Sequence, residues 1–127
     1  MIYDDFIRQL MLAATAATFV VFALWATFNP KSLASLLGYE LSTPNGQSEF
    51  HAIYIGLFFA QAMLCALAAV RVSDPVLGDL AALSLLAQPI GRLFAMFRYG
   101  VPHGVMRWLF LLELGGGIAL LLVRPAA

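Results

Sequence analysis

The sequence predicts an all-α membrane protein: an antiparallel bundle of four transmembrane helices, with a short interfacial helix between the first and the second. Two observations predict this fold class. The 127 residues are 62% hydrophobic and only 11% charged, far from the balance of a soluble globular protein. Two long stretches, 9–30 and 52–70, contain no Asp, Glu, Lys, Arg or His. Each stretch approaches the roughly 20 apolar residues that a helix needs to cross the hydrocarbon core.

Two further apolar segments complete the bundle, and each holds one ionisable side chain well inside it. They cover about 76–97, with Arg92, and 105–123, with Glu113. We therefore expect one integral membrane domain over residues 1–127. Its transmembrane helices are predicted at about 7–28, 49–70, 75–98 and 105–123, and its interfacial helix at about 31–37.

The first connection is predicted from its turn residues. The first helix should stop at Asn29-Pro30, because a residue that precedes proline is disfavoured in the helical conformation. KSLASLLG then has leucines at i, i+3 and i+4 and ends in Gly38, as expected of a short helix at the interface. STPNGQS is typical of a turn, which makes Ser48 the predicted N-cap of the second transmembrane helix.

The later connections are shorter. Asp74 followed by Pro75 predicts an immediate start for the third helix, so the second and third helices should be antiparallel neighbours. Pro89 should interrupt the third helix. The three consecutive glycines at 115–117 predict close helix packing.

Charge excludes one partner class and leaves the orientation open. Seven basic residues balance seven acidic ones, so nucleic acid is not an expected partner.

We call the membrane border at the N-terminus side A and the opposite border side B. Each border carries three basic residues, so the positive-inside rule does not decide the orientation. The basic residues are Arg8, Arg71 and Arg124 on side A and Lys31, Arg98 and Arg107 on side B.

Arg92 and Glu113 are expected to form an ion pair inside the membrane. Each lies six residues from a basic residue at side B, which places both roughly 9 Å inside that border. A lone charge at the bilayer centre costs about 2.5–3.5 kcal/mol, and pairing lowers that cost. The two residues lie on successive antiparallel helices at the same depth, so they can meet.

Further polar residues predict a cavity that opens toward side B. The predicted ligand-binding residues are Tyr54, Gln61, Gln88, Arg92 and Glu113, and His51 is expected at the mouth. A purely structural role is an equal alternative, because intramembrane polar residues often only join helices and an ion pair can only fix their register. No metal site is predicted, since the cysteine and carboxylate spacings of metal sites are absent.

With these residues in view, the chain resembles the DoxX-like group of small four-helix bacterial membrane proteins, and within it an uncharacterised branch with a domain of unknown function. The resemblance is carried by NPKSLASLLG, PNGQSEFHAIYIG, GRLFAMFRYGVP and the glutamate of the fourth helix. It implies four helices, the bacterial inner membrane and a shared Arg92 and Glu113 pattern. It brings no catalytic residues. Other members of the wider group accompany redox enzymes as partner subunits.

Two main functions remain open at this point, besides a less favoured transporter or proton pathway, which would require a homo-oligomer. The preferred one is a non-enzymatic protein that serves as an accessory subunit of a membrane complex or homo-oligomer, or that binds a lipophilic ligand such as a quinone, a pigment or a lipid. No cofactor is predicted, and soluble-enzyme motifs are absent. The alternative is an in-membrane isomerase or cyclase. Glu113 would then transfer protons, assisted by Arg92 and by Tyr54 or His51.

Overall fold

Four helices in the computed structural model, which describes residues 1–126, are long and apolar enough to cross a membrane. The chain is therefore a multi-pass membrane protein, and the predicted all-α four-helix architecture is confirmed. In chain order the elements are β1 (Ile2–Tyr3), α1 (Asp5–Phe28), α2 (Pro30–Leu37), α3 (Pro44–His51), η1 (Ala52–Leu57), α4 (Phe58–Val70), α5 (Pro75–Tyr99), α6 (Val105–Leu122) and β2 (Val123–Arg124).

Capping side chains set most helix ends where the sequence predicts them. Asn29 closes α1, and its side chain accepts a hydrogen bond from the Ser32 N–H to begin α2. Gly38 ends α2 in the left-handed conformation, with φ of 84°. Asp74 caps α5 through the Val76 N–H at 3.1 Å. The α5 helix continues through Pro89 to Tyr99, so this proline lies inside the helix and does not end it.

The second transmembrane helix begins earlier than the sequence predicts. Its N-cap is Thr43, whose hydroxyl accepts a hydrogen bond from the Gly46 N–H at 3.0 Å, and Pro44 occupies the first turn. The predicted turn and the predicted N-cap at Ser48 are therefore wrong. Proline and glycine favour a turn in isolation, but both are tolerated in the first helical turn, where the N–H groups need no helical partner.

A short π-helix, η1, interrupts the second transmembrane helix. It joins α3 to α4 over Ala52–Leu57 and turns Tyr54 into the protein core, where the side chain is 1% exposed. A π-helical turn is rare, lengthens the hydrogen-bond spacing and is frequently found at functional sites. The turn therefore explains how a tyrosine hydroxyl comes to lie inside the bundle.

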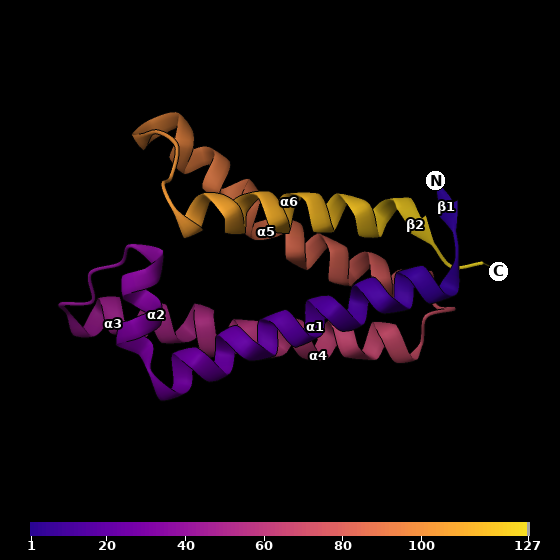
Figure 1. The fold of residues 1–127 in the computed structure, drawn as a ribbon, viewed down its shortest axis with the longest axis horizontal. Helices are drawn as coiled ribbons and strands as arrows, with labels where there is room; N and C mark the ends of the chain where they lie inside the picture. Colours follow the sequence, from indigo (N-terminus) through magenta and orange to yellow (C-terminus); the bar gives the residue numbers. More distant parts are fainter. Residues whose placement is uncertain (127) are drawn as a thin grey trace.

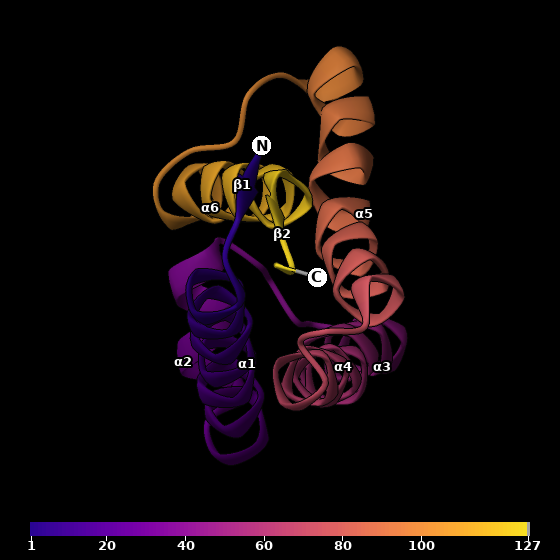
Figure 2. The same cartoon turned by 90° about the vertical axis from the view of Figure 1, so that its right-hand side faces the viewer.

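The four transmembrane helices form two pairs that diverge toward side B. Figure 1 shows α1 beside α4 and α5 beside α6, with both termini at the end where the pairs converge. Figure 2, viewed from that end, shows the helices arranged around a common centre. The pairs are joined mainly between α4 and α5, whereas α1 hardly touches α6. The α5–α6 pair is tight because Gly117 leaves room for Leu86, as the glycine run predicts.

Arg8 fastens the two pairs together at side A. Its guanidinium is fully buried and donates to the backbone oxygens of Val123 at 2.8 Å and Pro75 at 3.2 Å. It also donates to Asp79 at 3.2 Å, and Arg124 donates to the same carboxylate. One side chain of α1 thus binds the start of α5 and the end of α6. The parallel pairing of β1 with β2 adds a backbone connection there.

Gly78 makes the Arg8 contacts possible, and this yields a stability prediction. A Cβ atom at position 78 would collide with the Arg8 guanidinium. We expect Gly78→Ala to lower the free energy of unfolding. Overpacking alone typically costs about 1–3 kcal/mol, and the displaced arginine also loses its hydrogen-bond partners. Thermal unfolding in lipid nanodiscs measures the change.

Gly115→Ala is the matched control for that experiment. Gly115 is also in a transmembrane helix, but a Cβ atom there meets nothing within 4 Å. Its substitution should leave stability unchanged or raise it slightly, because alanine favours the helical conformation. Equal melting temperatures for the two variants would show that Arg8 does not hold the side-A end.

Candidate ligand-binding site

Arg92 and Glu113 meet inside the bundle, as the sequence predicts. A terminal guanidinium nitrogen of Arg92 lies 3.6 Å from Glu113 Oε1. The Glu113 side chain is 5% exposed and that of Arg92 is 17% exposed. The pair joins α5 to α6 and keeps two charges out of the lipid as one neutral unit.

The two members of the pair differ in how well they are hydrogen-bonded. Arg92 donates to Gln88 Oε1 at 3.2 Å and contacts the sulfur of Met106. Within residues 1–126, neither carboxylate oxygen of Glu113 accepts a hydrogen bond, although both are buried. A buried polar group without a hydrogen-bond partner costs about 1–3 kcal/mol, and more when it is charged. Glu113 is thus an acceptor with unused capacity.

Glu113 lies on the wall of a cavity of about 290 Å³, which we call the Glu113 cavity. Helix α1 contributes one wall and α6 the other, with Phe58 and Leu85 between them. The remaining wall is almost wholly apolar. The lining residues are Ala14, Thr15, Thr18, Phe19, Phe22, Phe58, Leu85, Val105, Trp108, Leu109, Leu112, Glu113 and Gly116.

Apart from the indole N–H of Trp108, the free polar side-chain atoms on that wall are acceptors. The Thr15 hydroxyl donates its proton to the Met11 backbone oxygen at 2.8 Å, and the Thr18 hydroxyl donates to Ala14 at 2.9 Å. Only their oxygen lone pairs remain available. These lone pairs and the carboxylate of Glu113 can accept hydrogen bonds from a ligand, and most of the other lining side chains are apolar.

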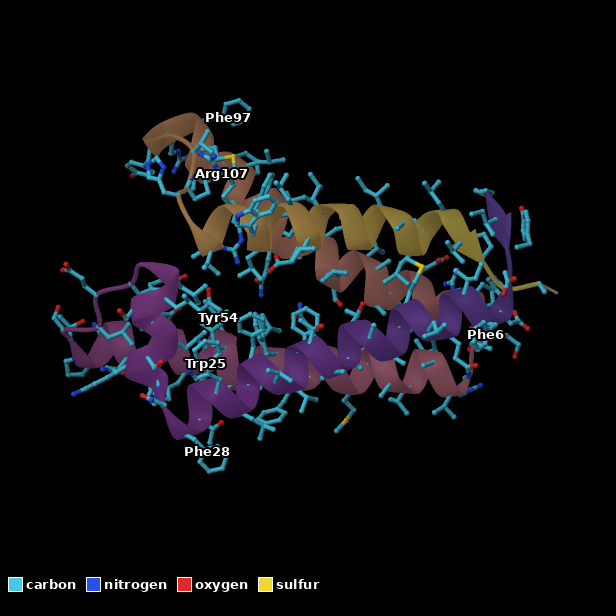
Figure 3. All side chains as sticks on the ribbon, viewed as in Figure 1. Phe6, Trp25, Phe28, Tyr54, Phe97 and Arg107 are labelled. Carbon is cyan, nitrogen blue, oxygen red and sulfur yellow. The ribbon has the colours of Figure 1, made fainter. Side chains whose placement is uncertain are left out.

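A second cavity, of about 310 Å³, lies between η1 and α5, and we call it the Tyr54 cavity. Arg92 and Gln88 line it together with Tyr54 and Tyr39. Tyr54 lies between the two helix pairs in Figure 3. The other lining residues are Ile53, Leu57, Gly91 and Ala95.

The structure divides the five predicted ligand-binding residues. Glu113 faces one cavity, whereas Tyr54, Gln88 and Arg92 face the other. Gln61 lines neither of these cavities; its amide donates to the Ser84 backbone oxygen at 3.0 Å and joins α4 to α5.

His51, predicted at the mouth, lies outside both linings. Its ring nitrogen Nδ1 is 2.7 Å from the Gln47 backbone oxygen, one turn earlier in α3. Among residues 1–126, no group of three potential metal-ligating side chains is close enough to hold an ion.

None of the predicted ligand-binding residues lies on α1, although α1 contributes a wall of the Glu113 cavity. Thr15, Thr18 and Phe22 form one wall of the Glu113 cavity, and their i, i+3, i+7 spacing was the available signal. The cluster of Arg8, Asp79 and Arg124 was missed because the arginines were placed at a solvated border. A signal existed here too, since Asp79 lies within the first turns of a transmembrane helix.

The ion pair predicts a specific pattern of stability changes. Arg92→Leu should destabilise strongly, by about 3–5 kcal/mol, because it leaves the Glu113 carboxylate buried without a counter-charge. The double variant Arg92→Leu/Glu113→Leu should recover most of that loss, because no charge is then left behind. Thermal unfolding of the two single variants and the double variant measures the coupling. Additive losses would mean that the two side chains do not interact.

Comparison with known proteins identifies one family. The family described as "Domain of unknown function (DUF4345)" matches residues 7–124, and the predicted membership in a family with such a domain is confirmed. No curated protein matches the chain. No solved structure matches it either. Since the match covers nearly the whole sequence, the chain belongs to the DUF4345 family.

Proposed function

We propose that this protein binds a lipophilic molecule with a hydroxyl group in the Glu113 cavity, from within the bilayer. The observation that supports this most directly is the buried Glu113 carboxylate, which lines an apolar cavity and accepts no hydrogen bond from residues 1–126. The DoxX-like resemblance would place the protein in the bacterial inner membrane. That placement and a role beside a larger complex are parts of the proposal.

The chemistry of the wall selects the ligand's head group. The carboxylate of Glu113 and the lone pairs of Thr15 and Thr18 accept hydrogen bonds and have no proton to offer. A hydroxyl group supplies the missing donor. A hydrogen bond to a charged acceptor contributes about 1.5–3 kcal/mol, more than one between neutral groups.

The arrangement of the helices favours entry from the lipid. Helices α1 and α6 form opposite walls of the cavity but make few contacts with each other. A ligand can therefore pass between them without leaving the hydrocarbon phase. A volume of about 290 Å³ holds a molecule of the size of a short isoprenoid alcohol.

The geometry gives less support to the enzymatic alternative. An isomerase or cyclase would need a proton relay from Glu113 through Tyr54 or His51. Tyr54 lines the other cavity, and His51 is bonded to its own helix. Arg92 stands between Glu113 and the tyrosine as a cation that keeps its proton. Ligand binding requires none of these transfers.

Binding of farnesol tests the proposal. Trp108 lines the cavity, so a Trp25→Phe background leaves it as the only tryptophan, and its fluorescence should change saturably as farnesol is added. Farnesyl methyl ether, which cannot donate a hydrogen bond, should bind about tenfold more weakly. Glu113→Gln should reduce the preference for the alcohol, because the amide is a weaker acceptor.

Two glycine variants provide the matched controls. Gly116→Leu places a side chain in the cavity, where a Cβ makes only ordinary contact with Leu85, and should abolish binding. Gly115→Leu adds the same side chain on the outer face and should bind as the parent does. Equal affinity for the alcohol and the ether, or equal binding by both variants, would contradict the proposal. A protein chain that co-purifies with every variant would instead support the accessory role.

A further inference from the structure

We propose that the Tyr54 cavity is a second binding site, which takes an uncharged molecule through its carbonyl oxygen. This site lies on the other side of the Arg92–Glu113 pair and is independent of the hydroxyl site proposed above. Within residues 1–126, its buried polar atoms without a partner are the donors Arg92 Nε and Gln88 Nε2, whereas those of the Glu113 cavity are the two acceptor oxygens of Glu113.

Arg92 and Gln88 bring two free donors to the lining of the Tyr54 cavity. Arg92 Nε and Gln88 Nε2 are buried and have no hydrogen-bond partner in the described part of the chain. The oxygen of the Gln88 amide is already occupied by Arg92. The amide nitrogen has no partner in that part of the chain, so its N–H bonds are free to donate.

The two tyrosines add a third donor. The hydroxyl oxygens of Tyr39 and Tyr54 lie 3.1 Å apart, so one hydroxyl donates to the other. The proton of the accepting hydroxyl remains free for another partner. Three kinds of donor, a guanidinium, an amide and a phenol, thus line one cavity of about 310 Å³.

Charge decides which acceptor fits. The positive charge of Arg92 is already balanced by Glu113 at 3.6 Å. An anionic ligand would add an uncompensated negative charge next to that carboxylate, inside a medium of low dielectric constant. A neutral carbonyl accepts two hydrogen bonds without this cost. Both the ester group of a bilayer lipid and a free aldehyde or ketone have this chemistry.

Gly91 and Ala95 provide the space for such a molecule. Both line the cavity from α5, and a Cβ atom at Gly91 would meet nothing within 4 Å. A leucine at position 91 can therefore fill the cavity without displacing the backbone. This makes Gly91→Leu a blocking variant that leaves every donor in place.

The test uses farnesal, an aldehyde, and farnesene, a hydrocarbon with the same chain length, on protein in dodecyl maltoside, a detergent without carbonyl groups. Farnesal should bind saturably, and its infrared carbonyl band should shift to lower frequency because the oxygen accepts hydrogen bonds. Gln88→Leu should weaken binding about fivefold and reduce the shift. Farnesene should bind at least tenfold more weakly than farnesal, about the effect of losing one strong hydrogen bond.

The controls separate this site from the first one. Gly91→Leu should abolish the band shift, whereas Gly116→Leu and Gly115→Leu should preserve it. A shift that survives Gly91→Leu, a shift lost in Gly116→Leu, or equal affinity for farnesal and farnesene would overturn the inference. Failure of farnesol binding at the Glu113 cavity would leave these results untouched.

Two lipid compositions then identify the natural source of the carbonyl. Nanodiscs are prepared from diphytanoyl phosphatidylcholine with ester linkages or from its ether-linked counterpart, which has no carbonyl. If farnesal binds more weakly in the ester-linked bilayer, the lipid itself competes for the site. Equal affinity in both bilayers identifies a free carbonyl compound as the occupant.

Discussion

The buried guanidinium of Arg8 is the interaction on which the rest of the structure depends. It connects α1 to the first turn of α5 and to the residue that follows α6. Hydrophobic attraction does not hold helices together within lipid, so packing and hydrogen bonds of this kind determine how they assemble. Because the bundle is fastened at side A, the two helix pairs can diverge at side B (Figure 1). Residues of both pairs line each of the two cavities.

The ion pair of Arg92 and Glu113 organises the space that this divergence creates. The pair lies between the two cavities: the Glu113 cavity has the free acceptor oxygens of Glu113, and the Tyr54 cavity has the free donors of Arg92 and Gln88. The pair itself carries no net charge. Most buried polar groups in proteins are hydrogen-bonded, and unsatisfied ones need an explanation. The proposed lipophilic ligands would supply hydrogen-bond partners to both sets at once. A purely structural pair would require only the contact between the two charges.

The sequence was sufficient to predict what depends on apolar length and on most of the helix caps, but not the N-cap at Thr43. The four spans, the interfacial helix and the meeting of Arg92 with Glu113 follow from the distribution of ionisable residues and from helix rise. The π-helix at Ala52–Leu57 was not predictable, because its hydrogen-bond shift depends on packing and not on any local residue signal. The separation of Tyr54 from Glu113 was missed for the same reason, since residues at one depth can face different helix neighbours.

The buried state of Arg8 also required the structure. An arginine at the start of a span is expected to extend toward water. Arg8 can turn inward because Gly78 has no Cβ atom in the space that the guanidinium occupies.

The most direct test of the role of Arg8 measures distances between spin labels in nanodiscs, on a Cys65→Ala background. One pair of labels replaces Phe6 and Leu122 at side A, and the other replaces Phe28 and Phe97, which project from opposite outer faces at side B (Figure 3). The account predicts a shorter and narrower distance distribution at side A than at side B. Similar distributions at the two ends would contradict it.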